Sequence, residues 1–179
     1  MICSLFSKAK RKNLVIKDLE ELIQEKINNL ITVNPTHIRM DYYKRYQAII
    51  DEYNSEQDKS KIEKIFNDLM RLVEELTEEE KRYIREEFDN DEELAYYDML
   101  FRENLSKNDI KKLKEVAVEL YNNLKVKIEE LDNWKEKDNT RATVRNLIKN
   151  TLYDKLPDSY ATEVIPQYIE QLYEYVYSR

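Results

Sequence analysis

Glycine is absent from all 179 residues of the chain. An average composition supplies roughly 7 % glycine. Phosphate-binding loops, dinucleotide-binding turns and the strained turns that present catalytic serines need glycine, because their backbone takes positive φ or lies close to a ligand. The sequence therefore excludes these sites. It also predicts a rigid scaffold whose backbone never needs a left-handed residue.

Cysteine and histidine are nearly absent as well, with Cys3 and His37 as the single examples. Zinc sites of the Cys/His type need several such ligands, and a disulfide within the chain needs two cysteines. We therefore predict no metal site, a free thiol at Cys3, and a cap or surface role for His37. Any catalysis would have to rest on carboxylates.

The densest carboxylate cluster lies at Glu78–Glu80, with Glu86 and Glu87 close behind. Consecutive residues on a helix point about 100° apart, so three adjacent carboxylates cannot converge on one ligand. We interpret the cluster as a solvated helix face and predict no catalytic residue in the chain.

Long apolar runs are also missing, and none approaches the roughly 20 residues that cross a bilayer. Residues 1–6 are mostly apolar, but the basic residues at 8, 10, 11 and 12 follow them. A secretory signal has its positive charge before a longer apolar core. The sequence therefore predicts a cytoplasmic protein without a membrane segment.

Charge is abundant, with 37 acidic and 30 basic residues and a net charge of −7. Eleven acidic and three basic residues lie between positions 74 and 93, so this stretch carries −8 and the remainder +1. Such an acidic surplus argues against nucleic acid covering the whole surface, although it leaves room for a local basic face.

Apolar residues recur at three- and four-residue spacing along almost the whole chain, and no stretch alternates strictly. This spacing predicts an all-α fold, an irregular bundle of about eight helices in a single packed unit. Residues 16–179 are expected to form this helical domain, after an N-terminal segment, residues 1–15, whose order the sequence leaves open. The helices are expected near residues 18–31, 39–54, 60–76, 77–88, 92–101, 106–131, 140–156 and 162–177.

Helix boundaries carry their own signals. Thr77 with Glu80, and Ser106 with Asp109, fit the capping-box pattern that begins a helix. Pro166 is tolerable only in the first turn of the last helix. The best boundary within the chain is predicted at residues 102–106.

Three basic residues, Arg141, Arg145 and Lys149, are spaced i, i+4, i+8 and therefore lie along one stripe of a helix. Such a stripe can bind the phosphates of duplex DNA or an acidic partner surface. It can equally pair with the acidic residues of positions 74–93 in the same molecule. Both interpretations remain open.

Aromatic residues gather near this stripe. Trp134, the single tryptophan, precedes it and is either a buried anchor or an interface hot spot. Four tyrosines lie around the circumference of the last helix and cannot all face one core, so some face solvent or a partner. The candidate contact residues for a partner or DNA are Trp134, Arg141, Arg145, Lys149, Tyr173 and Tyr177.

Two stretches carry distinctive motifs. Residues 34–36 read Asn-Pro-Thr, and residues 41–54 follow the form Asp-aromatic-x-x-Arg-Tyr-Gln-x-Ile-Ile-x-Glu-Tyr-Asn. Later, residues 131–135 read Leu-Asp-Asn-Trp-Lys, residues 140–145 read Thr-Arg-Ala-Thr-Val-Arg, and residues 156–157 read Leu-Pro.

In this order and separation, the motifs resemble the C-terminal region of the restriction (R) subunit of type I restriction-modification enzymes. The family pattern reads Leu-Asp-Trp, so Asn133 is an extra residue here. The resemblance covers residues 34–177. It implies a structural role for Asn34, Pro35, Thr36, Asp41, Arg45, Tyr46, Tyr53, Asn54, Val144, Leu156 and Pro157.

Restriction subunits of this family carry a nuclease domain, two motor domains that hydrolyse ATP with magnesium, and helical domains after them. They dock on a methyltransferase made of modification and specificity subunits, translocate DNA and cleave it. The chain resembles only the final helical part. The resemblance therefore implies a non-catalytic domain, without cofactor of its own, that docks the motor subunit onto the methyltransferase core and supports translocation. The motor domains of the same subunit are further implied partners. The alternative is a module that contacts duplex DNA through Arg141, Arg145 and Lys149.

Overall fold

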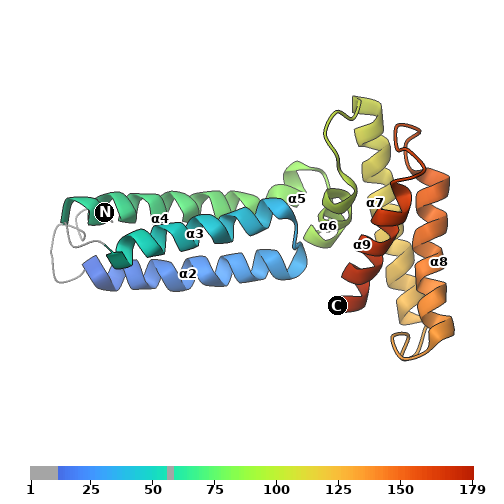
Figure 1. The fold of residues 1–179 in the computed structure, drawn as a ribbon, viewed down its shortest axis with the longest axis horizontal. Helices are drawn as coiled ribbons and strands as arrows, with labels where there is room; N and C mark the ends of the chain where they lie inside the picture. The colour runs from blue at the N-terminus through green and yellow to red at the C-terminus, as the bar shows by residue number, and fades with distance from the viewer. Residues whose placement is uncertain (1–11, 56–58) are drawn as a thin grey trace. The chain divides into compact units, whose positions relative to one another are not determined.

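A computed structural model describes residues 12–55 and 59–179 of the chain. Within these residues every regular element is a helix and no strand occurs, which confirms the all-α prediction. Cys3 and most of the N-terminal segment lie outside the described residues. Figure 1 shows the helices, which are α2 (Lys12–Val33), α3 (His37–Ser55), α4 (Lys59–Glu80), α5 (Arg82–Arg85), α6 (Asp91–Leu100), α7 (Lys107–Glu129), α8 (Asp138–Lys155) and α9 (Ile165–Ser178).

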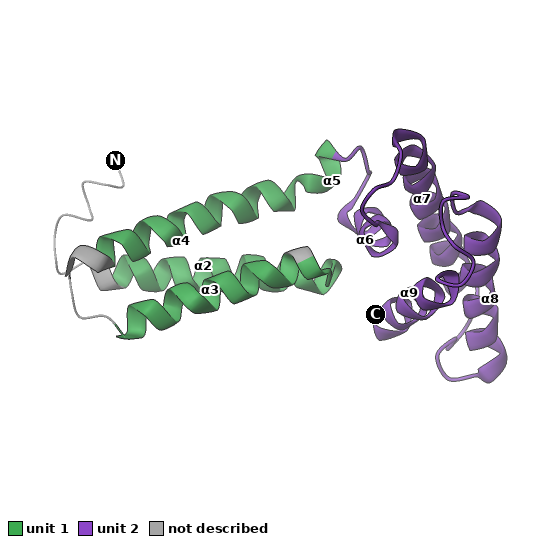
Figure 2. Ribbon diagram, turned by 45° about the horizontal axis from the view of Figure 1, so that its top comes forward, with its two compact units in different colours: residues 1–85 green, residues 86–179 purple. Residues whose placement is uncertain are grey.

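The contacts divide the chain into two compact units, residues 1–85 and residues 86–179 (Figure 2). The sequence instead indicated one packed unit, with residues 102–106 as its best internal boundary. That boundary is corrected because residues 102–106 only connect α6 to α7, and these two helices pack directly on each other. The division falls after α5.

The first unit is built on α2, α3 and α4, which pack pairwise on one another and lie side by side in Figure 1. Each helix contributes apolar side chains at the three- and four-residue spacing that the sequence shows, so one face of each is buried. The buried core residues are Ile16, Leu19, Ile23, Ile27, Leu30, Tyr46, Ile65, Phe66, Leu69, Leu72 and Leu76.

The Asn-Pro-Thr motif forms the turn between α2 and α3. Asn34 is fully buried, and its backbone N–H donates to the Leu30 carbonyl at 2.9 Å. Pro35 disfavours helical geometry in Asn34, the residue before it, so α2 ends at Val33. The carbonyl of Thr36 then accepts a hydrogen bond from the N–H of Met40 at 3.0 Å, within the first turn of α3.

Other motif residues of this unit fasten α3 to its neighbours. The hydroxyl of Tyr46 is buried and accepts a hydrogen bond from Gln24 Nε2 of α2 at 2.7 Å. Arg45 forms an ion pair with Glu75 of α4, with 2.6 Å between Nη1 and Oε2. Asp41 accepts a hydrogen bond from Lys44, while Tyr53 is half-buried against the core and Asn54 is exposed.

The predicted capping box at Thr77 is wrong. The Thr77 hydroxyl donates to the Val73 carbonyl, four residues earlier, at 2.8 Å. A threonine bonded in this way is satisfied inside a continuing helix, so α4 runs on to Glu80. The capping box at Ser106 is confirmed, because Asp109 N–H donates to the Ser106 hydroxyl and the Ser106 N–H donates to the Asp109 carboxylate.

The expectation of a backbone without left-handed residues is also wrong. Glu87, Asn104 and Asn133 take φ values of 62°, 67° and 50°. Asparagine tolerates this region because its short side chain bonds locally, whereas glutamate pays the full steric cost. The chain therefore makes left-handed turns without glycine.

The second unit contains α6 to α9, with α7 packed against α6 and α8, and α9 packed against α6 and α8. Asn90 caps α6 by accepting the N–H of Glu93 at 2.9 Å. Pro166 lies in the first turn of α9, as predicted. Core residues of this unit include Leu94, Leu100, Leu113, Ala117, Leu120, Val144, Ile148, Leu152 and Leu172.

Two motif residues close the far end of α8. Leu156 and Pro157 are both buried directly after the last residue of the helix. Tyr160 follows in the same turn, and its buried hydroxyl donates to the Leu100 carbonyl at 2.7 Å. The Leu-Pro motif therefore stops α8 and directs the chain back toward the end of α6.

Candidate functional site

The loop between α7 and α8 places Trp134. Asn133, the extra residue of the motif, takes the left-handed conformation, and its carbonyl accepts the N–H of Glu136 at 2.9 Å. The Trp134 carbonyl accepts a hydrogen bond from the Thr140 hydroxyl at 2.8 Å, which ties the loop to the first turn of α8. As a result the indole ring turns inward and only 7 % of the residue is exposed. Trp134 is thus a buried anchor.

Trp134 begins a row of three aromatic rings. The Tyr177 ring meets the indole edge-on, with 5.8 Å between the centroids and 87° between the planes. Tyr173 lies one turn earlier in α9 and stacks on Tyr177 at 6.0 Å. Tyr177 is 43 % exposed and Tyr173 is half-buried. The row therefore joins the buried Trp134 to the exposed Tyr177, with the half-buried Tyr173 on the other side of Tyr177.

Two cations flank the row. The Lys135 Nζ lies 5.8 Å from the ring centroids of both Trp134 and Tyr177. The Arg145 guanidinium lies 5.6 Å from the Tyr173 centroid and forms an ion pair with Glu170 of α9. Cations at these distances are attracted to the ring faces, so they help to hold the rings in place. We call Trp134, Lys135, Arg145, Tyr173 and Tyr177 the aromatic–basic surface.

The basic stripe continues this surface along α8. Arg141 forms an ion pair with Asp138 and donates to the Lys135 carbonyl at 2.8 Å. Lys149 is exposed and has no ion pair within the described part of the chain. The structure thus brings all six candidate contact residues to the neighbouring faces of α8, α9 and the preceding loop.

The partners of the stripe are not the acidic residues of positions 74–93. Its arginines pair with Asp138 and Glu170, and the acidic stretch pairs with other bases. These other pairs are Arg45–Glu75, Arg39–Glu79, Arg82–Glu79, Lys26–Glu80, Arg85–Glu78, Lys114–Glu86 and Arg179–Glu92. The arginines of the stripe do pair with carboxylates of the same molecule, but these carboxylates, Asp138 and Glu170, lie outside positions 74–93.

The acidic triplet is not wholly solvated, which corrects the interpretation of a solvated helix face. Glu79 is buried, and its Oε1 lies 3.0 Å from Arg39 Nε and 3.1 Å from Arg82 Nε. A buried carboxylate of this kind needs such partners to offset its loss of water. No group of three His, Cys, Asp or Glu side chains that could hold a metal ion occurs among the described residues.

The remaining tyrosines of α9 face inward. Tyr175 is buried and meets Tyr96 of α6 edge-on at 5.7 Å, and Tyr168 packs on Tyr160 at 5.7 Å. The expectation that the four tyrosines cannot share one core is therefore met, because Tyr177 alone of them is exposed.

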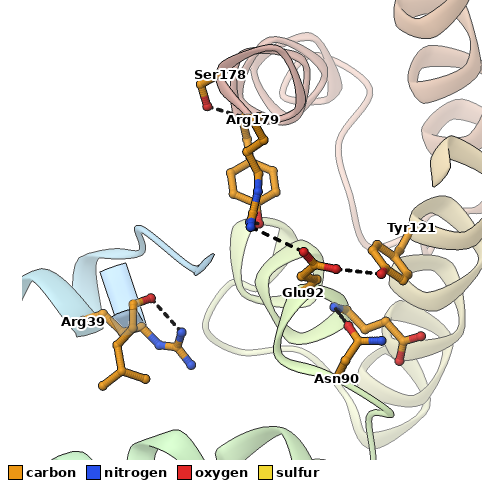
Figure 3. A network of polar contacts seen from close by, with 9 residues as sticks. Arg39, Asn90, Glu92, Tyr121, Ser178 and Arg179 are labelled. Atoms are coloured by element: carbon orange, nitrogen blue, oxygen red, sulfur yellow. Dashed lines mark hydrogen bonds and ion pairs between the residues drawn. The ribbon is translucent and has the colours of Figure 1, made fainter. Parts of the chain in front are cut away.

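Sequence reasoning missed a second polar cluster in this unit, shown in Figure 3. The Tyr121 hydroxyl of α7 donates to Glu92 Oε2 of α6 at 2.7 Å, and Arg179 Nη2 lies 3.4 Å from Glu92 Oε1. Partial burial raises the pKa of the Tyr121 phenol to about 12, and the hydrogen bond to Glu92 acts in the same direction. Three segments far apart in the sequence meet here, so no spacing signal marks the cluster.

Together these features define an all-helical region with an aromatic and basic surface on its second unit. None of its described helices is long and apolar enough to span a membrane. The family model for the C-terminal region of type I restriction enzyme HindI endonuclease subunit-like proteins matches residues 3–177. The chain therefore belongs to this family, which confirms the resemblance seen in its motifs. Searches of curated proteins and of solved structures gave no match.

Proposed function

We propose that the chain is a non-catalytic helical domain of a type I restriction subunit. It docks the ATP-dependent translocase and endonuclease subunit onto the methyltransferase core of modification and specificity subunits, and it supports translocation from there. The observation that carries this proposal is the aromatic–basic surface on a chain of this family.

The composition of the surface supports a protein partner. Tyrosine, tryptophan and arginine are enriched in protein interfaces and in their energetic hot spots. Tyr177 is exposed, yet its ring contacts Trp134, Tyr173 and Lys135. A side chain fixed before binding loses little conformational freedom when the partner arrives, so more of the contact energy appears as affinity.

Contact with duplex DNA is the weaker candidate. Arg141 and Arg145 each pair with a carboxylate, which reduces the net positive charge that the stripe offers to a run of phosphates. Lys149 alone of the stripe lacks an ion pair within the described residues. A face with so few uncompensated cations offers little of the counterion release that drives DNA binding.

Catalysis belongs, in this proposal, to the other domains of the parent subunit, and so do ATP and magnesium. The lack of glycine supports this division, because a phosphate-binding loop requires glycine where the backbone approaches the nucleotide.

The proposal is tested by measuring the affinity of the chain for the purified methyltransferase core by calorimetry. Tyr177→Ala should weaken binding about tenfold or more, as expected for an anchor residue. Tyr43→Ala is the matched control, because Tyr43 is 43 % exposed, like Tyr177, and lies on α3 in the first unit. Tyr43→Ala should bind like the unaltered chain. A core that does not bind the chain at all would refute the docking role.

A further inference from the structure

The aromatic–basic surface has a charge opposite to that of the whole chain. Together with the stripe it carries the cations of Lys135, Arg141, Arg145 and Lys149, and only Asp138 and Glu170 pair with them. Two of these four cations have no paired carboxylate among the described residues, whereas the chain as a whole carries −7. Such a local reversal favours and orients an acidic partner.

The cations of this surface lie close to the exposed Tyr177 ring and its neighbour Tyr173. Lys135 lies over the Tyr177 ring and Arg145 lies over Tyr173, so a group that packs on the tyrosines comes to lie beside both cations. A guanidinium has five N–H donors, so Arg145 can bind a partner carboxylate while it stays paired with Glu170. Lys149 extends the positive charge by one further turn of α8.

We propose that this surface binds an acidic protein segment of the methyltransferase core, in which aspartate or glutamate residues flank an apolar residue. The apolar residue packs on Tyr177, and the carboxylates pair with Lys149, Lys135 and Arg145. This inference rests on the proposed function and names the chemistry of the partner.

A protein segment fits better than single-stranded nucleic acid. Bases stack on exposed aromatic faces. Here Trp134 is 7 % exposed, and the Tyr173 ring already stacks on Tyr177 and lies beside Arg145. Tyr177 alone offers an exposed ring, which suits one apolar side chain better than a stack of several bases, and the cations beside it can pair with carboxylates of the same segment.

Carbodiimide cross-linking of the full chain to the methyltransferase core tests the inference directly. The reagent joins a lysine amine to a carboxylate in contact with it and leaves no spacer. Lys149 and Lys135 should cross-link to aspartate or glutamate residues of one segment of the core. Lys149→Arg should keep the affinity and lose its own cross-link, because arginine keeps the charge without a reactive amine.

Charge reversal gives a second measurement. Lys149→Glu should weaken binding roughly threefold to tenfold at low salt, mainly through slower association, and less at high salt. Lys112→Glu is the matched control, since Lys112 is also an exposed lysine of the second unit, on α7. It should change the affinity less than twofold.

The outcomes separate the two proposals. If Tyr177→Ala weakens binding but Lys149 forms no cross-link to a carboxylate and Lys149→Glu binds normally, docking stands and the acidic segment is refuted. If duplex DNA, rather than the core, protects the Lys149 amine from acetylation by an N-hydroxysuccinimide ester, the acidic segment is refuted in favour of a phosphate contact. If the core does not bind the unaltered chain, both proposals fail.

Discussion

Glu87 stores backbone strain that glycine would release. Its φ of 62° lies in the left-handed region, its side chain is exposed, and no described contact depends on it. Left-handed geometry costs an L-residue about 1–2 kcal/mol. Glycine has more conformational freedom in the unfolded chain, which lowers the free energy of unfolding by up to about 1 kcal/mol. Glu87→Gly should therefore stabilise the second unit by about 0.5–1 kcal/mol.

Thermal unfolding followed by circular dichroism measures this gain. A stabilisation of this size should raise the midpoint by about 2–4 °C. Glu87→Gln tests whether the lost charge is the cause, because it removes the charge and keeps the strain, and it should leave the midpoint nearly unchanged. Glu103→Gly makes the same exchange at a turn residue whose own φ is not positive, and it should not stabilise. A Glu87→Gly variant no more stable than the unaltered chain would refute the assignment of strain to this residue.

Two further predictions concern capping and pH. Ser106→Ala should lower the unfolding free energy, measured by urea titration, by about 1 kcal/mol, because it removes a confirmed capping box. Thr77→Ala should lower it clearly less, since the Thr77 hydroxyl bonds within a continuing helix. Equal losses would contradict the two assignments. Because the pKa of Tyr121 is raised to about 12 in the folded chain from 10.0, its contribution to stability is complete below pH 10 and is lost as the pH rises toward 12. Tyr121→Phe should therefore flatten the decline in unfolding free energy between pH 10 and pH 12, and an unchanged slope would show that Tyr121 does not titrate differently on folding.

The helices could be placed from the sequence because a helix that buries one face needs apolar residues at three- and four-residue spacing. The apolar residues recurring from Ile110 to Leu131 are an example, since Leu113, Ala117, Leu120 and Leu124 are buried and those at either end are half-buried. The helix ends were harder. Thr77 and Ser106 carry the same local pattern, and only the backbone around each decides whether the hydroxyl caps a new helix or bonds back into the old one.

The candidate surface was partly predictable for a related reason. The spacing of Arg141, Arg145 and Lys149 places them on one face of any helix, so their alignment follows from local geometry. The contact of Arg145 with Glu170 and Tyr173 depends on how α9 packs against α8, which no local pattern encodes. The same holds for the Tyr121–Glu92–Arg179 cluster, whose members come from three separate segments.

Hydrogen–deuterium exchange of the full chain, with and without the methyltransferase core, tests the central claim most directly. The docking proposal predicts slowed exchange in residues 130–149 and in the last turns of α9, the segments that carry the aromatic–basic surface. Protection confined to the first unit, or no protection anywhere in the presence of a core that binds, would contradict it.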